Sequence, residues 1–275
     1  MKGSKLPPEI MRHYEAGAEN GRLDSGGGYL ERIRTQEIVK RFLPRRSLDI
    51  LDIGGGPGAY SSWLAGLGHN VRLVDVVPLH IEHARATAQG GSRELFDAKV
   101  GDARQVELPS GCMDAVLMLG PLYHLTRKRD RIQSSKEAHR VLRPKGLLFA
   151  AAISRYASLI DGLKYRFIDD PVFRGVLRRD LKQGQHRNPT AAKGYFTTAF
   201  FHHPNELRQE VKEARFTLKG IYAIEGPAEL LYGDKLDEML RDDETKSHVL
   251  RFLTEVETEP SLLGVSSHLL AVAMK

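Results

Sequence analysis

The chain has 275 residues, of which 41% are hydrophobic and 28% are charged, and its formal net charge is +6. This composition suits a globular protein with a sizeable core, in one large domain rather than two equal ones. The single cysteine, Cys112, excludes an internal disulfide and a cysteine-based zinc site. Met1–Ile10 has no apolar run typical of a signal peptide, and nothing approaches transmembrane length. We therefore expect a cytoplasmic protein without a membrane partner.

The charge is unevenly distributed along the chain. Arg155–Lys193 holds nine Lys/Arg against four Asp, and Ala228–Glu259 holds ten acids against four Lys/Arg. Two oppositely charged surfaces, packed together or not, explain this pattern, and so does a basic lid over an anionic substrate. A nucleic-acid partner is less favoured, because the basic segment lacks a Lys/Arg run with interleaved aromatics.

The N-terminal part is predicted to be an arm followed by a helix, over residues 1–47. Met1–Tyr29 looks irregular, whereas Glu31–Leu43 has apolar residues near helical spacing and Pro44 ends it. Three residues of this part are candidates for substrate contact: Tyr14, Arg22 and Arg34. Packing and solvated surface are the competing explanations for each of them.

The stretch Leu48–Gly58 predicts a buried strand that ends in a ligand-binding turn. It is short, largely apolar and followed at once by glycines, and Ala59–Gly68 then reads as a helix. The turn satisfies the dinucleotide pattern G-x-G-x-x-A. It also satisfies acid-x-G-x-G-x-G from Asp52, and a carboxylate at that point suits a positively charged ligand better than a pyrophosphate. A glycine-rich turn without a ligand is the third possibility.

Further strands and helices alternate after this turn. Val71–Asp75 is a strand ending in an acid, and a carboxylate there accepts two hydrogen bonds from a ribose diol. The following segments are a helix over Leu79–Gln89, a strand over Leu95–Val100 ending in Gly101-Asp102-Ala103, a strand over Met113–Gly120, a helix through Leu142, a turn at Pro144-Lys145-Gly146 and a strand over Leu147–Ser154. This alternation predicts a doubly wound α/β sheet with ligands at the carboxyl ends of its strands.

Four of these stretches, in this order, resemble the class I S-adenosylmethionine-dependent methyltransferases. They are the glycine turn, the acid at Asp75, the Gly101-Asp102 pair and the Arg-Pro-Lys-Gly turn before the fifth strand. The resemblance implies a seven-stranded sheet of order 3-2-1-4-5-7-6 with strand 7 antiparallel, so that Phe216–Glu225 and Ser267–Met274 are the last two strands. A helix over Pro204–Ala214 and a mostly helical Ala228–Val256 complete the predicted domain, residues 48–275.

The same resemblance implies S-adenosylmethionine as cofactor and assigns residues to it. Asp52 and the turn backbone serve the methionine end, Asp75 the ribose, and Asp102 the adenine. The whole implied set is Asp52, Gly54, Gly55, Gly56, Gly58, Asp75, Val76, Asp102, Ala103, Leu119 and Gly120.

The acceptor side carries no diagnostic motif. His124 follows the fourth strand and is a candidate base, with Tyr123 beside it; a structural histidine is the alternative. Residues 155–203 are predicted to be an inserted substrate cap of short helices, with Tyr195, His186 and His202 as tentative substrate contacts. A metal at His202 and His203 is not expected, since adjacent side chains on a strand point to opposite faces.

These observations predict methyl transfer to a small-molecule acceptor. Three alternatives stay open: an RNA or protein methyltransferase that uses the basic cap, an NAD(P)-dependent oxidoreductase, and a non-catalytic S-adenosylmethionine-binding protein. Whether the methyl goes to carbon, oxygen or nitrogen, and the oligomeric state, are left undecided by the residues.

Overall fold

The computed structural model describes residues 7–17, 19, 21–89, 96–190, 192, 194–231 and 233–275. Its centre is a seven-stranded sheet of order β3-β2-β1-β4-β5-β9-β8. The strands are β1 Asp49–Ile53, β2 Asn70–Asp75, β3 Phe96–Val100, β4 Met113–Met118, β5 Leu142–Ile153, β8 Thr217–Ala223 and β9 His268–Met274. β9 runs antiparallel to both of its neighbours, and the pairs from β3 to β5 are parallel. The predicted sheet order is thus confirmed.

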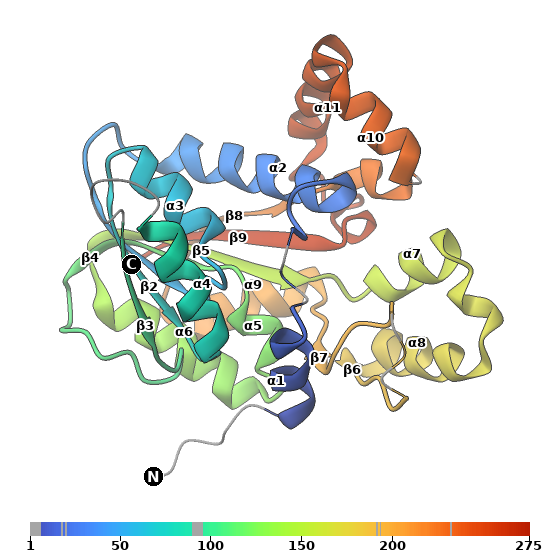
Figure 1. Cartoon of the computed structure of the whole chain (residues 1–275), viewed down its shortest axis with the longest axis horizontal. Helices are drawn as coiled ribbons and strands as arrows, with labels where there is room; N and C mark the ends of the chain where they lie inside the picture. The colour runs from blue at the N-terminus through green and yellow to red at the C-terminus, as the bar shows by residue number, and fades with distance from the viewer. Residues whose placement is uncertain are drawn as a thin grey trace.

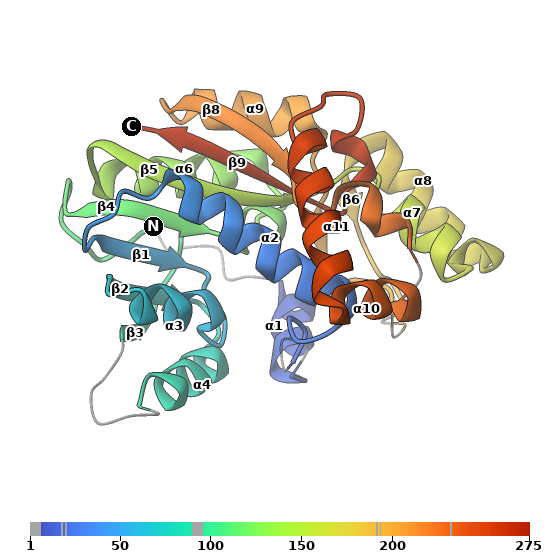
Figure 2. The same ribbon diagram turned by 90° about the horizontal axis from the view of Figure 1, so that it is seen from above.

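Helices cover both faces of this sheet (Figures 1 and 2). One face packs against α2 Gly26–Phe42, α3 Ala59–Gly66 and α4 Pro78–Ala88, and the other against α6 Lys128–Val141 and α9 Pro204–Glu213. Alternate residues of β1 divide between the two cores, since Ile50 lies in the first and Leu51 and Ile53 in the second. This double burial explains why the strand is apolar on both sides.

The N-terminal arm is more regular than its sequence suggests. α1 Pro8–Glu15 begins with a proline, and α2 begins at Gly26, so the glycine run forms the first turn of a helix that was predicted to start at Glu31. The amide of Gly26 is held by the carboxylate of Asp237, at 2.7 Å from a distant part of the chain. A contact of that kind is invisible to local sequence patterns.

Three other boundaries differ from expectation. The predicted helix through Leu142 is divided into α5 Pro121–His124 and α6. The predicted turn at Pro144-Lys145-Gly146 lies inside β5, where Lys145 has φ +65° and the register against β4 shifts. The predicted mostly helical Ala228–Val256 is confirmed, but it is divided into η2 Gly226–Leu230, α10 Gly233–Arg241 and α11 Asp243–Val256, and η3 Leu263–Val265 follows before β9. Leu95, the predicted start of β3, lies outside the described residues.

The segment after β5 extends beyond the carboxyl end of that strand, on the side away from β3 (Figures 1 and 2). It contains α7 Ala157–Lys164, η1 Phe167–Asp169, α8 Pro171–Gln183 and a two-stranded sheet of β6 Gln185–His186 and β7 Ala199–Phe200. Its last residues return to the sheet, where the amide of His202 donates to the carbonyl of Ile153 at 2.7 Å. Within the described part of the chain, no helix is both long and apolar enough to cross a membrane.

Candidate functional site

A cavity of about 650 Å³ opens at the carboxyl ends of β1, β2 and β4. This is the edge at which open α/β sheets bind ligands, and the volume is within the usual range of about 300–1,000 Å³ for ligand sites. Every residue implied for the cofactor lines the cavity except Gly58. The arm supplies the remaining wall, through residues from Tyr14 to Arg32.

The glycine turn leaves space where side chains would otherwise stand. Gly56 has φ +56°, and a Cβ built on it would meet no atom within 4 Å although the residue is buried, so it faces the open cavity. Its amide donates to Asp75 Oδ2 at 2.9 Å, and the amide of Val77 donates to Oδ1 at 2.8 Å. These bonds fix the Asp75 carboxylate while leaving each oxygen a second lone pair for a ligand hydroxyl. Gly58 has a structural role instead, since a Cβ there would lie 2.8 Å from the Phe96 ring.

Asp52 presents a buried carboxylate to the cavity. Its side chain has no exposed surface; Oδ2 accepts from the Ser61 hydroxyl at 2.8 Å, and Oδ1 has no partner among the described residues. Burial raises its pKa to about 7, with the Asp75 charge adding to the effect and the Ser61 bond opposing it. An unpartnered buried oxygen of this kind favours a ligand that brings a donor or a positive charge.

Asp102 lies at another part of the cavity wall and is already ion-paired. The Arg104 guanidinium bonds both of its oxygens, with Nε 2.9 Å from Oδ1 and Nη2 2.5 Å from Oδ2. Burial alone would raise the Asp102 pKa, but the Arg104 side-chain and backbone bonds lower it. Arg104 also lines the cavity, so the two residues together shape this wall.

A cluster of aromatic side chains forms the opposite wall. Helix α1 brings Tyr14 onto His124, and the Tyr14 hydroxyl bonds to His124 Nε2. The Tyr123 ring lies 4.6 Å from the His124 ring, centroid to centroid. Tyr14 is 7% exposed and His124 8% exposed. Burial lowers the His124 pKa to about 3, so the ring is neutral at physiological pH and Nε2 can accept from the hydroxyl.

Among the described residues of the arm, Arg22 is one of two cations at the cavity, with Arg32. Its Nη1 lies 2.5 Å from Glu31 Oε2, and its Nε lies 2.9 Å from Glu19 Oε2. The two carboxylates hold the guanidinium in place beside the cavity. Sequence reasoning singled out Arg22 but missed both of its partners, because nothing in their spacing sets them apart from surface acids.

Comparisons with known proteins agree with this geometry. Residues 51–150 match a protein-family model described as a methyltransferase domain. Over 132 residues the chain is 28% identical to a ubiquinone/menaquinone biosynthesis C-methyltransferase, UbiE, of Zymomonas mobilis; the match covers 48% of this chain and 53% of the relative. It is 31% identical over 131 residues to a ubiquinone biosynthesis O-methyltransferase of Methylocella silvestris, covering 46% and 50%. The chain thus spans about half the length of the curated relatives it matches.

A solved structure extends the likeness to nearly the whole fold. An S-adenosylmethionine-dependent methyltransferase from Mesorhizobium loti superposes with a TM-score of 0.58 at 18% identity, over 90% of this chain and 100% of that one. Residues 51–150 thus form a methyltransferase domain, and the chain around them has the fold of the class I S-adenosylmethionine-dependent methyltransferases. This similarity implies S-adenosylmethionine as the cofactor.

The cavity fits that cofactor on two structural observations. The unpartnered oxygen of Asp52 meets the need of a ligand with a sulfonium and an ammonium group, and the open space at Gly56 admits a ligand close to the backbone. Other lining residues of this methyltransferase domain were not foreseen, among them Tyr60 and His80. They follow the glycine turn and Asp75 in sequence, and that position is the only signal that could have found them.

Four of the tentative substrate residues lie outside the cavity lining. Arg34 is fully buried and bonds to Glu37, Glu257 and Thr254. The remaining three make structural contacts in or beside the segment after β5: Tyr195 donates to Asp170 at 2.6 Å, His186 bonds Asp180 at 2.7 Å, and His202 bonds Glu210 at 3.2 Å. The prediction of substrate contact is therefore withdrawn for these four residues. Among the described residues of 155–203, none lines the cavity.

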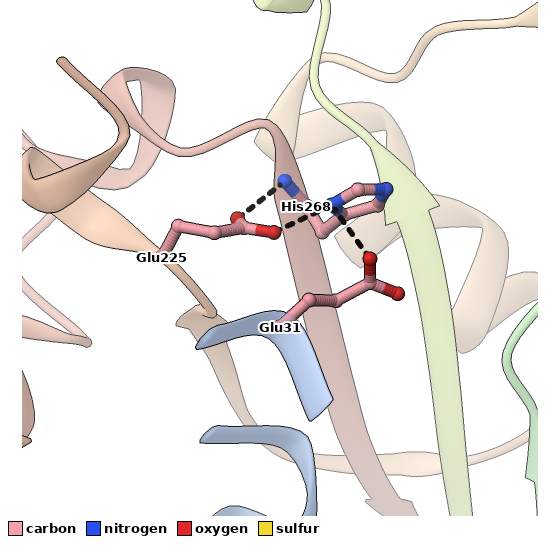
Figure 3. A group of neighbouring side chains, drawn as sticks. All are labelled: Glu31, Glu225 and His268. Carbon is pink, nitrogen blue, oxygen red and sulfur yellow. Dashed lines mark hydrogen bonds and ion pairs between the residues drawn. The ribbon is translucent and has the colours of Figure 1, made fainter. Parts of the chain in front are cut away.

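A second polar cluster, formed by Glu31, Glu225 and His268, borders the cavity through Glu31. His268 Nδ1 lies 2.6 Å from Glu225 Oε1 and 3.9 Å from Glu31 Oε2, as Figure 3 shows. The three side chains come from α2, the end of β8 and the start of β9, and their donor types are those of a metal site. In this structure they instead bond to one another and to Arg22: Glu225 bonds His268, and Glu31 accepts two hydrogen bonds from the Arg22 guanidinium, at 2.5 and 3.2 Å.

Proposed function

We propose that this protein transfers a methyl group from S-adenosylmethionine to a small-molecule acceptor held between the glycine turn and the Tyr14–His124 pair. One observation carries the proposal: the same cavity is lined by the residues implied for the cofactor and by the buried, hydrogen-bonded pair of Tyr14 and His124. The two curated relatives are named as C- and O-methyltransferases of quinone biosynthesis, which supports a small acceptor without choosing the atom.

Within the proposed site, each polar residue has a separate task. Asp52 and the backbone of the turn would hold the methionine end, with Arg22 as the cation for its carboxylate. Asp75 holds the ribose diol, and Asp102 with Ala103 borders the adenine. Leu119 and Gly120 line the sulfonium end.

S-adenosylmethionine supplies an electrophilic methyl on a sulfonium, so the protein has to position the acceptor and accept its proton. The Tyr14 hydroxyl lines the cavity and donates to His124 Nε2. It would accept a hydrogen bond from an acceptor hydroxyl; that oxygen becomes strongly acidic as its bond to the methyl forms, so its proton can pass to Oη while the Tyr14 proton passes to Nε2. Positioning of this kind supplies about 7–11 kcal/mol of a bimolecular barrier.

Burial favours a small acceptor over a macromolecular one. The side chains of Tyr14, on α1, and His124 are both more than nine-tenths buried. An RNA base or a protein side chain would therefore reach them only if α1 were displaced. Asp52 likewise disfavours the dinucleotide alternative, because its ionised form repels a pyrophosphate, whereas a cationic ligand stabilises that form. We also propose that residues 1–47 form the acceptor-side wall and residues 48–275 the cofactor domain, with 155–203 as an insertion that supports the arm.

The test is calorimetric titration of the purified protein with S-adenosylhomocysteine, S-adenosylmethionine and NADPH. Micromolar binding of the first two without the third is expected, and Asp75→Ala should weaken it at least tenfold through lost hydrogen bonds to the ribose. A panel of phenols, catechols, quinols and amines then identifies the acceptor by release of S-adenosylhomocysteine. Binding of NADPH alone, or turnover on RNA with a steep salt dependence, would overturn the proposal.

A further inference from the structure

A continuous series of polar contacts joins the sheet to the arm. Ser266 donates to Glu225 Oε2 at 2.7 Å, and the backbone amide of His268 donates to the same oxygen at 2.9 Å. The other oxygen of Glu225 binds His268 Nδ1, which faces Glu31 on α2 (Figure 3). Glu31 in turn holds Arg22 at the cavity. The series therefore ends at Arg22, in the wall of the cavity proposed to hold the cofactor.

His268 is charged at neutral pH in this arrangement. Burial would lower its pKa, but the carboxylates of Glu31 and Glu225 outweigh burial and raise it to about 9, with a small opposing effect from Arg22. Two acids and one base lie farther from the His268 ring: Asp161, Glu229 and Lys164. Lys164 Nζ lies 3.5 Å from Glu229 Oε1 and so offsets part of the acidic charge. An imidazolium between two carboxylates cancels their mutual repulsion and allows both to stay ionised.

We infer that His268 is a positioning residue for the amino-acid end of the cofactor, acting through Glu31 on Arg22. This inference rests on the proposed function, because it assigns Arg22 to the methionine carboxylate. Without the imidazolium, Glu31 and Glu225 repel each other across the space that His268 spans. Glu31 then turns from the sheet, and Arg22 loses the anchor that keeps its guanidinium beside the cavity.

The inference can be tested with two ligands that differ in the amino-acid group. S-adenosylhomocysteine carries the amino-acid group, whereas 5′-methylthioadenosine has the same adenosine and a thioether without it. His268→Gln should weaken S-adenosylhomocysteine about fivefold or more at pH 7, the low end of coupling between linked sites, and leave 5′-methylthioadenosine within about twofold. His248→Gln is the matched control, because that imidazole is 62% exposed on α11, lies 3.9 Å from Glu244 and should change neither affinity.

A pH series adds a readout that a purely structural histidine would not give. The ratio of S-adenosylhomocysteine affinities, wild type over His268→Gln, should fall toward one as pH rises through about 9, where the wild-type imidazolium loses its proton. The ligand's own titration cancels in this ratio. Glu225→Gln removes one flanking charge and so lowers the pKa of the imidazole. If His268→Gln fails to fold, the ratio of S-adenosylhomocysteine affinities, wild type over Glu225→Gln, should rise between pH 7 and 9, where the variant's imidazolium loses its proton first.

Each result bears on a different claim. If neither adenosine ligand binds the wild type, the proposed function fails. If both bind and His268→Gln weakens both equally, or the affinity ratio is flat with pH, His268 has no positioning role. If zinc binds the wild type tightly at pH 7 and His268→Gln abolishes that binding, the cluster is a metal site and the imidazolium assignment is overturned.

Discussion

Replacing Gly56 by alanine should abolish tight cofactor binding while leaving the fold nearly intact. Gly56 has a left-handed φ of +56°, so the added methyl costs about 1–2 kcal/mol in backbone conformation. No protein atom lies within 4 Å of that methyl, so no further packing strain arises in the empty protein. With the cofactor bound, however, the methyl occupies space inside the cavity. We expect at least a tenfold higher dissociation constant for S-adenosylhomocysteine, which is about 1.4 kcal/mol.

The chain contains a matched control for the backbone cost. Gly68, at the end of α3, has φ +88° and also has no atom within 4 Å of a built Cβ, but it does not line the cavity. Gly68→Ala should lower the unfolding free energy by a similar amount and leave the affinity unchanged. Urea unfolding and calorimetry on both variants measure the two quantities separately. Equal affinities in the two variants would refute the claim that the Gly56 turn lies against the ligand.

Three further outcomes follow from the structure. His124→Gln should lower turnover about 100-fold or more, as is typical for loss of a general base, while the S-adenosylhomocysteine affinity stays within about threefold; unchanged turnover would remove His124 from the reaction. Arg34→Ala should lower the unfolding free energy by about 3 kcal/mol in urea, because it leaves the buried Glu257 with Arg41 alone, and it should not change cofactor affinity; a neutral effect on stability would contradict the buried ion pair. At pH 6 the Asp52 carboxyl, whose pKa is about 7 in the empty protein, is mostly protonated, so binding the cation-bearing cofactor should release a proton. Calorimetry in two buffers of different ionisation enthalpy measures that proton, and Asp52→Asn should lose it.

Much of the cofactor side of the site could be predicted from local sequence patterns. Alternating apolar runs and helices predict a doubly wound sheet, and the resemblance to the methyltransferases supplies its strand order. The glycine turn, Asp75 and Asp102 each follow or end a strand on the same edge of the sheet. Such features depend on residues close together in the chain. The ion pair of Asp102 with Arg104 is also local, yet the sequence alone does not show that this carboxylate is already bonded.

The acceptor half depends on contacts between distant residues, and the sequence misled there. His186 and His202 were predicted as tentative substrate contacts, but each is buried against one acid, His186 against Asp180 and His202 against Glu210. Only the fold shows which acid each histidine meets. Arg34 was taken for a substrate contact because it sits in the arm. Its actual partner, Glu257, is 223 positions away. Conversely, Glu31 and His268 carried no signal at all.

The arm's place in the cavity wall has a consequence for how such a protein diversifies. Tyr14 and Arg22 precede the matched methyltransferase domain, which begins at residue 51, whereas Asp52, Asp75 and Asp102 lie within it. One part of the cavity wall thus comes from a stretch of the gene outside the matched domain. Under the proposed function, changes in the codons for α1 alter the wall around Tyr14 and spare Asp52, Asp75 and Asp102, so exchanging α1 while keeping Arg22 and Glu31 is a short route to a new acceptor.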